Sequence, residues 1–378
     1  MNLLSLFQNR LMRYPLVSSL LISVLFLNSC SSGKSAYKHG DYFEAVLTAV
    51  QRLRQNPDHK KSKEVLSLSY QPAINYLETD AQNQIASNAN FKWRSAVQNY
   101  EKINQLYEEI RTSPGALRVI PNPVNKYNEL TEVKAKAAEE SYEAGVNAML
   151  KNTRQDAKQA YFLFKEAGTL SPGYRESIEM MNQAEYNATL RVAYEELNTT
   201  RYNLGSLQPA VTSVKRQFLE FYPEQEAKNG TLPIDQNLKI ILAGYAEGKP
   251  TITNRTENLV DSVKSGEKTV NGVKTPTYQK VTAKITYYDK SVLARGEVTI
   301  IITDKNGATI KNSSISGSYH WQTNWASFTG DVRALADRHK KLCEKKESNP
   351  SASELMNKVK AELDKNLSAE LKGFYSQY

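Results

Sequence analysis

The feature that most constrains this chain is an uncharged, mostly apolar segment near its N-terminus, from Leu16 to Cys30. Arg10 and Arg13 precede the segment, and small polar residues lie at its end. A basic flank, an apolar run and a small-residue end form the layout of an export signal, and the run is shorter than the roughly 20 residues of a membrane-spanning helix. We therefore expect residues 1–29 to be a signal peptide that is removed.

The end of this segment resembles the lipobox of bacterial lipoproteins, in which a cysteine is acylated and becomes the first residue of the mature chain. The matching residues are Leu27-Asn28-Ser29-Cys30, with Asn28 where a smaller residue is usual. The resemblance implies acyl chains on Cys30, and Ser31 implies sorting to the outer membrane, facing the periplasm. Translation from Met12 would shorten the signal without moving the cut. The alternative is a buried helix in which Cys30 is an ordinary core residue.

Charge and cysteine content bound the remaining function classes. The chain has 49 Lys and Arg against 40 Asp and Glu, a net charge of +9, and losing Arg10 and Arg13 leaves +7. The excess of basic residues is spread along the chain and forms no dense block, so we expect no nucleic-acid partner. Contact with anionic lipid or peptidoglycan is an alternative use of this charge. With Cys30 acylated, Cys343 is the only other cysteine, which excludes an intramolecular disulfide.

Motifs of catalysis and cofactor binding are missing from the sequence. It contains no phosphate-binding glycine loop, no HExxH, no GxSxG and no CxxC. The four histidines, at positions 39, 59, 320 and 339, do not pair at helical metal-ligand spacing. We therefore predict a protein without catalysis, metal or cofactor.

After a short tether, residues 30–38, a repeat pattern begins. Gly40, Tyr42, Ala45 and Pro57 fall at the spacing of the second half of a tetratricopeptide unit, where Gly turns the chain, Ala permits close helix contact and Pro ends the helix. A weaker copy begins at Trp93. Between the copies we expect further helices, with a kink or break at Pro72 in the one from Glu64 to Leu77.

The clearest copy combines Gly145 on a first helix with small, aromatic and proline residues on a second: Ala160, Phe164, Ala167 and Pro172. Residues 39–186 therefore resemble a tetratricopeptide-type array of antiparallel helix pairs. Helix pairs of this kind stack on their neighbours and leave a concave surface that binds peptides. The alternative is a spacer that lifts a second domain off the membrane.

The pattern changes after about Asn187, and residues 187–378 predict an α+β domain with a mainly antiparallel sheet and a C-terminal helix. Its expected elements are strands at 189–194, 238–245, 281–287 and 298–302, a helix at 207–219, a hairpin turn at 304–307 leading into a strand, and a helix that begins at Ser351 and ends at Gly373. For residues 254–276 we expect a long loop or a weak hairpin at Val270-Asn271-Gly272-Val273. We expect the strand carrying Ile300–Ile302 to be central.

A dense cluster of unusual residues lies between the sheet and the last helix. Its candidate binding patch consists of Tyr319, Trp321, Trp325, Asp331 and Arg333. The aromatic side chains suit stacking on sugar rings or a peptide, and the acid suits acid/base chemistry, but aromatic core packing and a simple loop ion pair explain the same residues.

The lipobox and the helical half together are similar to tetratricopeptide-repeat lipoproteins of the Gram-negative cell envelope. That resemblance implies a lipid-anchored scaffold or adaptor that binds an envelope protein partner. The alternative from the residues is a glycan-binding or peptidoglycan-binding module that uses Tyr319, Trp321 and Trp325. A hydrolase would need Asp331 or Asp337 paired with another carboxylate in a cleft.

Overall fold

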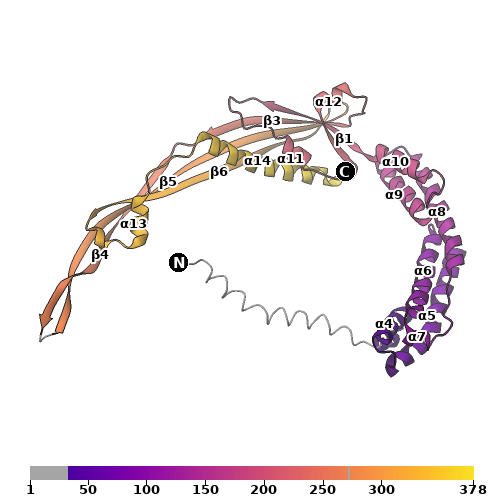
Figure 1. Ribbon diagram of the computed structural model, residues 1–378. Coiled ribbons are helices and arrows are strands. Elements are labelled where there is room, and N and C mark those ends of the chain that lie inside the picture. Colours follow the sequence, from indigo (N-terminus) through magenta and orange to yellow (C-terminus); the bar gives the residue numbers. More distant parts are fainter. Residues whose placement is uncertain (1–32, 271–272) are drawn as a thin grey trace. The chain divides into compact units, whose positions relative to one another are not determined.

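The computed structural model describes residues 33–270 and 273–378, and these divide into two compact units at Ala188/Thr189. The N-terminal unit is helical, and the C-terminal unit is a mixed sheet followed by a C-terminal helix (Figure 1). The signal peptide and Cys30, predicted above, lie outside the described residues.

Successive helices of the helical unit pack against one another: α4 against α5, α5 against α6, α6 against α8, α8 against α9, and α9 against α10. The helices are α3 (Lys34–Lys38), α4 (Tyr42–Gln55), α5 (Lys60–Ala86), α6 (Lys92–Arg111), α7 (Pro114–Leu117), α8 (Tyr127–Met149), α9 (Arg154–Leu170) and α10 (Ser177–Ala188). Of the kink or break expected at Pro72, the break is wrong, because α5 runs through this residue without interruption. Contacts between neighbours of this kind build a core one helix at a time.

Small residues bring these helices close together. Ala45 and Ala49 on α4, and Ala160 and Ala167 on α9, are fully buried. At Gly145 on α8 an added Cβ atom would lie 2.8 Å from the ring of Phe164 on α9, and that ring is itself fully buried. The absence of a side chain at residue 145 is therefore what admits the Phe164 ring between α8 and α9.

This contact predicts the effect of Gly145→Ala. The added methyl group must displace a buried ring, so we expect the free energy of unfolding to fall by about 1–3 kcal/mol. Gly168→Ala on α9 is the matched control, because its Cβ atom would meet only Ser177, with Oγ at 3.4 Å and Cβ at 4.0 Å. Alanine is the better helix former, so the control should not destabilise the protein. Urea denaturation measures both, and equal effects would contradict this role of Gly145.

The sheet of the C-terminal unit is built on one long central strand, β5 (Val273–Asp304), as the Ile300–Ile302 run predicted. The other strands are β1 (Leu190–Asn198), β2 (Leu219–Pro223), β3 (Gln236–Glu247), β4 (Thr251–Val270) and β6 (Thr309–Gly330). β1 pairs in parallel with β2 and β3, whereas β5 pairs antiparallel with β3, β4 and β6, so the sheet is mixed. Along one side of β5, β3 pairs with its C-terminal part and β4 with its N-terminal part.

The helical elements of this unit are α11 (Gln208–Thr212), α12 (Glu224–Asn229), the 3-10 helix η2 (Val332–Ala334), α13 (Asp337–Glu344), α14 (Ala352–Phe374) and the 3-10 helix η3 (Tyr375–Gln377). The Ser351 hydroxyl caps α14 by accepting the Glu354 N–H at 3.0 Å, as the sequence predicted. The helix continues through Gly373, the predicted end, to Phe374.

Two further expectations for this unit are corrected, and one is decided between its alternatives. The helix predicted at 207–219 is confined to the short α11, and β2 begins at Leu219. Of the long loop and the weak hairpin expected for 254–276, the hairpin is confirmed, because residues 254–270 and 273–276 belong to β4 and β5, which pair antiparallel up to Val270 and Val273. The separate strands at 281–287 and 298–302 are parts of the single strand β5.

The long strand β5 buries opposite faces at its two ends. Its odd-numbered residues from Val281 to Tyr287 are buried, whereas its even-numbered residues from Lys290 to Ile302 are buried instead. Because side chains alternate across a strand, the covered face changes between these two stretches. η2 and α13 cover the first face, and α14 covers the second.

The chain between α13 and α14 must therefore pass from one face of the sheet to the other around the edge strand β6. On the α13 face, Lys345 Nζ donates to Asn324 Oδ1 of β6 at 3.0 Å. On the α14 face, Lys290 Nζ donates to Glu347 Oε1 at 2.6 Å and to Asn349 Oδ1 at 2.5 Å. These contacts fasten the crossing segment, residues 345–350, where β5 changes its covered face.

From the buried ammonium of Lys290 we predict how substitutions at this crossing change the stability of the protein. The Lys290 side chain is 4% exposed and that of Glu347 is 50% exposed. Glu347→Ala would leave the Lys290 ammonium with Asn349 as its one partner. We expect the free energy of unfolding to fall by about 1–2 kcal/mol. The decrease is smaller than for a fully buried ion pair because water reaches Glu347. Lys290→Met removes the charge but keeps most of the apolar stem, so it should lower the free energy of unfolding less than Glu347→Ala does. Urea denaturation of both variants checks the order, and the reverse order would contradict the account.

Candidate functional site

The main candidate site is a groove in the helical unit. It has a volume of about 820 Å³ and is formed by α6, α8 and α9. The residues that line it are Phe91, Arg94, Val97, Gln98, Glu101, Lys134, Gln159, Phe162, Leu163, Lys165, Glu166, Thr169 and Leu170. The volume lies in the range of ligand pockets, about 300–1,000 Å³.

Apolar side chains form much of the lining of this groove. Val97 on α6 and Leu163 on α9 are buried, and Leu170 packs against the helical core. Phe162 on α9 is different, because 53% of its surface is exposed. It belongs to a groove that already contains other apolar side chains, so a ligand could cover it together with them.

One end of the groove is built around Phe91, which precedes α6 in a left-handed backbone conformation with φ of 57°. Such a conformation is uncommon for a bulky residue and needs support from its surroundings. The Phe91 N–H donates to Glu140 Oε1 at 2.6 Å, and the Arg94 guanidinium carbon lies 4.4 Å from the centre of the Phe91 ring.

Arg94 connects this end to α9. Its guanidinium forms an ion pair with Glu166, whose carboxylate also accepts from the Ser141 hydroxyl at 3.2 Å. Among the described residues, Arg94 Nε and Glu140 Oε2 are buried and have no hydrogen-bond partner. Unsatisfied buried polar atoms are costly and uncommon. Arg94 lines the groove and Glu140 does not, and both atoms are buried, so they do not themselves define a ligand contact.

Charge on the groove is close to balanced. Lys134 Nζ lies 2.7 Å from Glu101 Oε1, so an ion pair between α8 and α6 flanks the groove. Lys165 on α9 has no ion pair in the part of the chain that the structure describes, and its ammonium lies 5.9 Å from the centre of the Tyr161 ring. The lining thus has three cations and two acids, with Lys165 as its unpaired cation.

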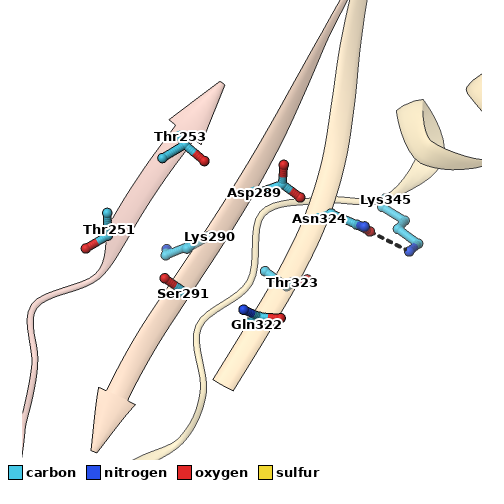
Figure 2. A pocket seen from close by; sticks show the side chains of 9 residues that line it. All are labelled: Thr251, Thr253, Asp289, Lys290, Ser291, Gln322, Thr323, Asn324 and Lys345. Atoms are coloured by element: carbon cyan, nitrogen blue, oxygen red, sulfur yellow. Dashed lines mark hydrogen bonds between the residues drawn. The ribbon is translucent and has the colours of Figure 1, made fainter. Parts of the chain in front are cut away.

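A second hollow lies on the sheet of the C-terminal unit, with a volume of about 440 Å³. Figure 2 shows polar side chains from three neighbouring strands in it, together with Lys345, which donates to Asn324. Its lining consists of Thr251, Thr253, Asp289, Lys290, Ser291, Gln322, Thr323, Asn324 and Lys345. The hollow lies beyond the C-terminal end of α13, where the sheet face is uncovered, and a solvated face accounts for its polarity.

The predicted aromatic residues share one face of β6 but differ in their surroundings. By register, Tyr319 and Trp321 lie opposite Ala294 and Val292, and both are half-buried against the core beneath α14. Trp325 lies further along the strand and stacks on Tyr288, with ring centres 5.1 Å apart and planes 11° from parallel. The three aromatic rings therefore do not gather around one open surface.

The predicted Asp331 and Arg333 lie beyond the end of β6, where Asp331 caps η2 and Arg333 is part of it. Arg333 Nη2 lies 2.6 Å from Asp331 Oδ2, and the Asp331 carboxylate also accepts the Arg333 N–H at 2.9 Å. These hydrogen bonds from Arg333 lower the pKa of Asp331 to about 2. The pair stabilises its own turn, and Asp331 is ionised over the whole physiological pH range.

Cys343, the cysteine other than Cys30, is a free thiol on α13. It is partly buried against Ile285 and Tyr287 of β5, and this burial raises its pKa. A raised thiol pKa disfavours the reactive thiolate. Cys343 therefore has the character of a packing residue.

Sequence reasoning missed the groove residues Phe162, Arg94 and Glu166. A Phe between Tyr161 and Leu163 reads as one member of an apolar helical face, and nothing local shows that this ring points outward. Arg94 and Glu166 are 72 positions apart in sequence. The useful signal was the predicted repeat itself, since stacked helix pairs leave a concave surface.

The wider comparisons add no relative. No protein-family model and no curated protein matches the chain. Among residues 33–270 and 273–378, no helix is long and apolar enough to cross a bilayer. The same residues contain no group of three or more His, Cys, Asp or Glu side chains arranged to hold a metal ion.

Proposed function

We propose that this protein is a lipid-anchored adaptor of the bacterial cell envelope that binds a partner protein without catalysing a reaction. In this proposal Cys30 carries the acyl chains, the protein resides at the periplasmic face of the outer membrane, and residues 39–186 form a tetratricopeptide-type array. The groove of α6, α8 and α9 receives a segment of the partner. The exposed Phe162 ring within this otherwise partly apolar groove is the observation that carries the proposal.

Contacts between the helices support the tetratricopeptide assignment. Gly145 and Phe164, predicted as repeat positions, meet between α8 and α9, and the predicted small residues Ala45, Ala160 and Ala167 are buried at helix contacts. Successive helices pack on their neighbours, as in repeat proteins. Grooves of this kind receive peptides as helices or extended segments.

Chemistry of the groove defines the partner segment. An apolar or aromatic side chain of the partner would cover Phe162, and an acidic side chain would pair with Lys165. The apolar contact supplies most of the affinity, because buried aromatic anchors dominate interfaces, whereas the more exposed charges contribute to orientation. We therefore propose an amphipathic segment with an apolar anchor and a nearby acid as the ligand.

Phe162→Ala tests this role. We first recover the partner by crosslinking in native envelope membranes, and then measure its affinity for purified protein by titration. Loss of the ring should weaken binding about tenfold or more. Tyr76→Ala on α5 is the control, because Tyr76 is also an exposed aromatic side chain, 69% exposed, but does not line the groove. Equal affinities of the two variants would contradict the assignment of the groove.

The anchor is tested by labelling with palmitate in growing cells. We expect the wild-type protein to incorporate the label and Cys30→Ala to lose it, because the acyl chains are attached through this cysteine. Cys343→Ala removes the only other cysteine of the chain and should keep the label. Labelled Cys30→Ala protein would contradict acylation at Cys30, whatever the groove binds.

A further inference from the structure

β4 and β5 continue beyond the rest of the sheet as a two-stranded hairpin. The last pair between β5 and β6 joins Ala283 to Gly330, whereas pairing between β4 and β5 continues to Val270 and Val273 (Figure 1). Every described side chain from 264 to 280 is exposed. We call these exposed residues, 264–270 and 273–280, the distal hairpin. Two-stranded hairpins are marginally stable in water without a packing partner, so a contact made outside this unit would stabilise the distal hairpin.

Large apolar side chains are exposed at the far end of this distal hairpin. Val270 and Val273 lie opposite each other across the two strands, with 49% and 66% of their surfaces exposed. Side chains directly opposite in an antiparallel pair lie on the same face. Tyr278 is exposed further back on β5. The end of the hairpin therefore presents an apolar surface to its surroundings.

Lysines accompany these apolar side chains. The distal hairpin carries lysines at 264, 268, 274 and 280 and one acid, Glu267, and Asp261 precedes it on β4. Lys264 Nζ lies 2.6 Å from Glu267 Oε1, which neutralises one charge of each sign. Lys268 and Lys274 have no ion pair among the described residues. Lys274 directly follows Val273 on β5, and Lys268 lies two residues before Val270 on β4. The apolar end is therefore followed directly by positive charge.

We propose that the distal hairpin binds the surface of a bilayer that contains anionic phospholipid. Val270 and Val273 enter the interface between headgroups and acyl chains, and Lys268 and Lys274 contact the headgroup phosphates. Long lysine side chains bury their apolar stems while the ammonium stays in water, and tyrosine favours the same interface. An acidic polymer would engage the lysines alone and would leave the apolar end uncovered, which is why the bilayer is the better fit.

Vesicle sedimentation tests the proposal with the chain from Ser31 to Tyr378, which contains every described residue and lacks the apolar segment and Cys30. We expect binding to phosphatidylcholine vesicles that contain phosphatidylglycerol, weaker binding to phosphatidylcholine alone, and a decrease with added salt. Each of Lys268→Gln and Lys274→Gln should weaken binding about fivefold. Val270→Ser with Val273→Ser should weaken it about tenfold.

Controls from the same unit are Val332→Ser and Lys305→Gln. Val332 is 50% exposed, close to Val270, and lies on η2, whereas Lys305 lies exposed in the turn between β5 and β6. Both should bind vesicles as the unsubstituted chain does, and thermal unfolding should be unchanged for all variants because none is in the core. The proposal is overturned if hairpin and control variants bind equally, if vesicles are not bound, or if an acidic polysaccharide competes the protein off the vesicles. Since the chain tested has no acyl group and an intact groove, none of these outcomes bears on the proposed adaptor function.

Discussion

The C-terminal unit depends on the change of covered face within β5. A strand of this length can bury the same face throughout only if one layer of helices covers it from end to end. In this unit two separate layers cover opposite faces of β5: η2 with α13 cover one face, and α14 covers the other. The chain must cross the sheet edge between them, and Lys290 is buried at that point with its charge met by Glu347 and Asn349. Beyond the first layer, the strands continue without cover as the distal hairpin. The exposed hairpin and the uncovered polar hollow thus both follow from where the covering layers end.

The helical unit follows a different constraint, in which each helix is covered mainly by its neighbours along the chain. Close contact requires small residues such as Gly145 opposite large ones such as Phe164. This arrangement buries the contacts between helices but leaves a groove on α6, α8 and α9, with Phe162 exposed in it. The groove is therefore a consequence of how the helices stack on one another. The ion pairs around it, Arg94 with Glu166 and Lys134 with Glu101, hold its helices in position.

Periodicity was enough to predict the helical half, the mixed α and β character of the second half, the turn at 304–307 and the cap at Ser351. It left alternatives open where local sequence was polar, and it failed where a strand changed its covered face. Residues 254–276 contain few apolar residues, so a long loop and a weak hairpin at Val270–Val273 were both expected, and the pairing of β4 with β5 decides for the hairpin. The alternation in 281–287 and that in 298–302 have opposite phase, which made one strand look like two. The groove depends on residues far apart in sequence, and the outward direction of the Phe162 ring is set by packing that no local pattern encodes.

The proposed adaptor function depends most on whether the groove is occupied in the cell, and site-specific photocrosslinking measures this directly. The photoreactive amino acid p-benzoylphenylalanine is introduced in place of Phe162 in one strain and in place of Tyr76 in another, and the cells are irradiated. The account predicts one discrete crosslinked product from position 162, none from position 76, and a crosslinked partner peptide that carries an apolar side chain near an acid. No product at 162, or the same products from both positions, would contradict a peptide-binding groove on α6, α8 and α9.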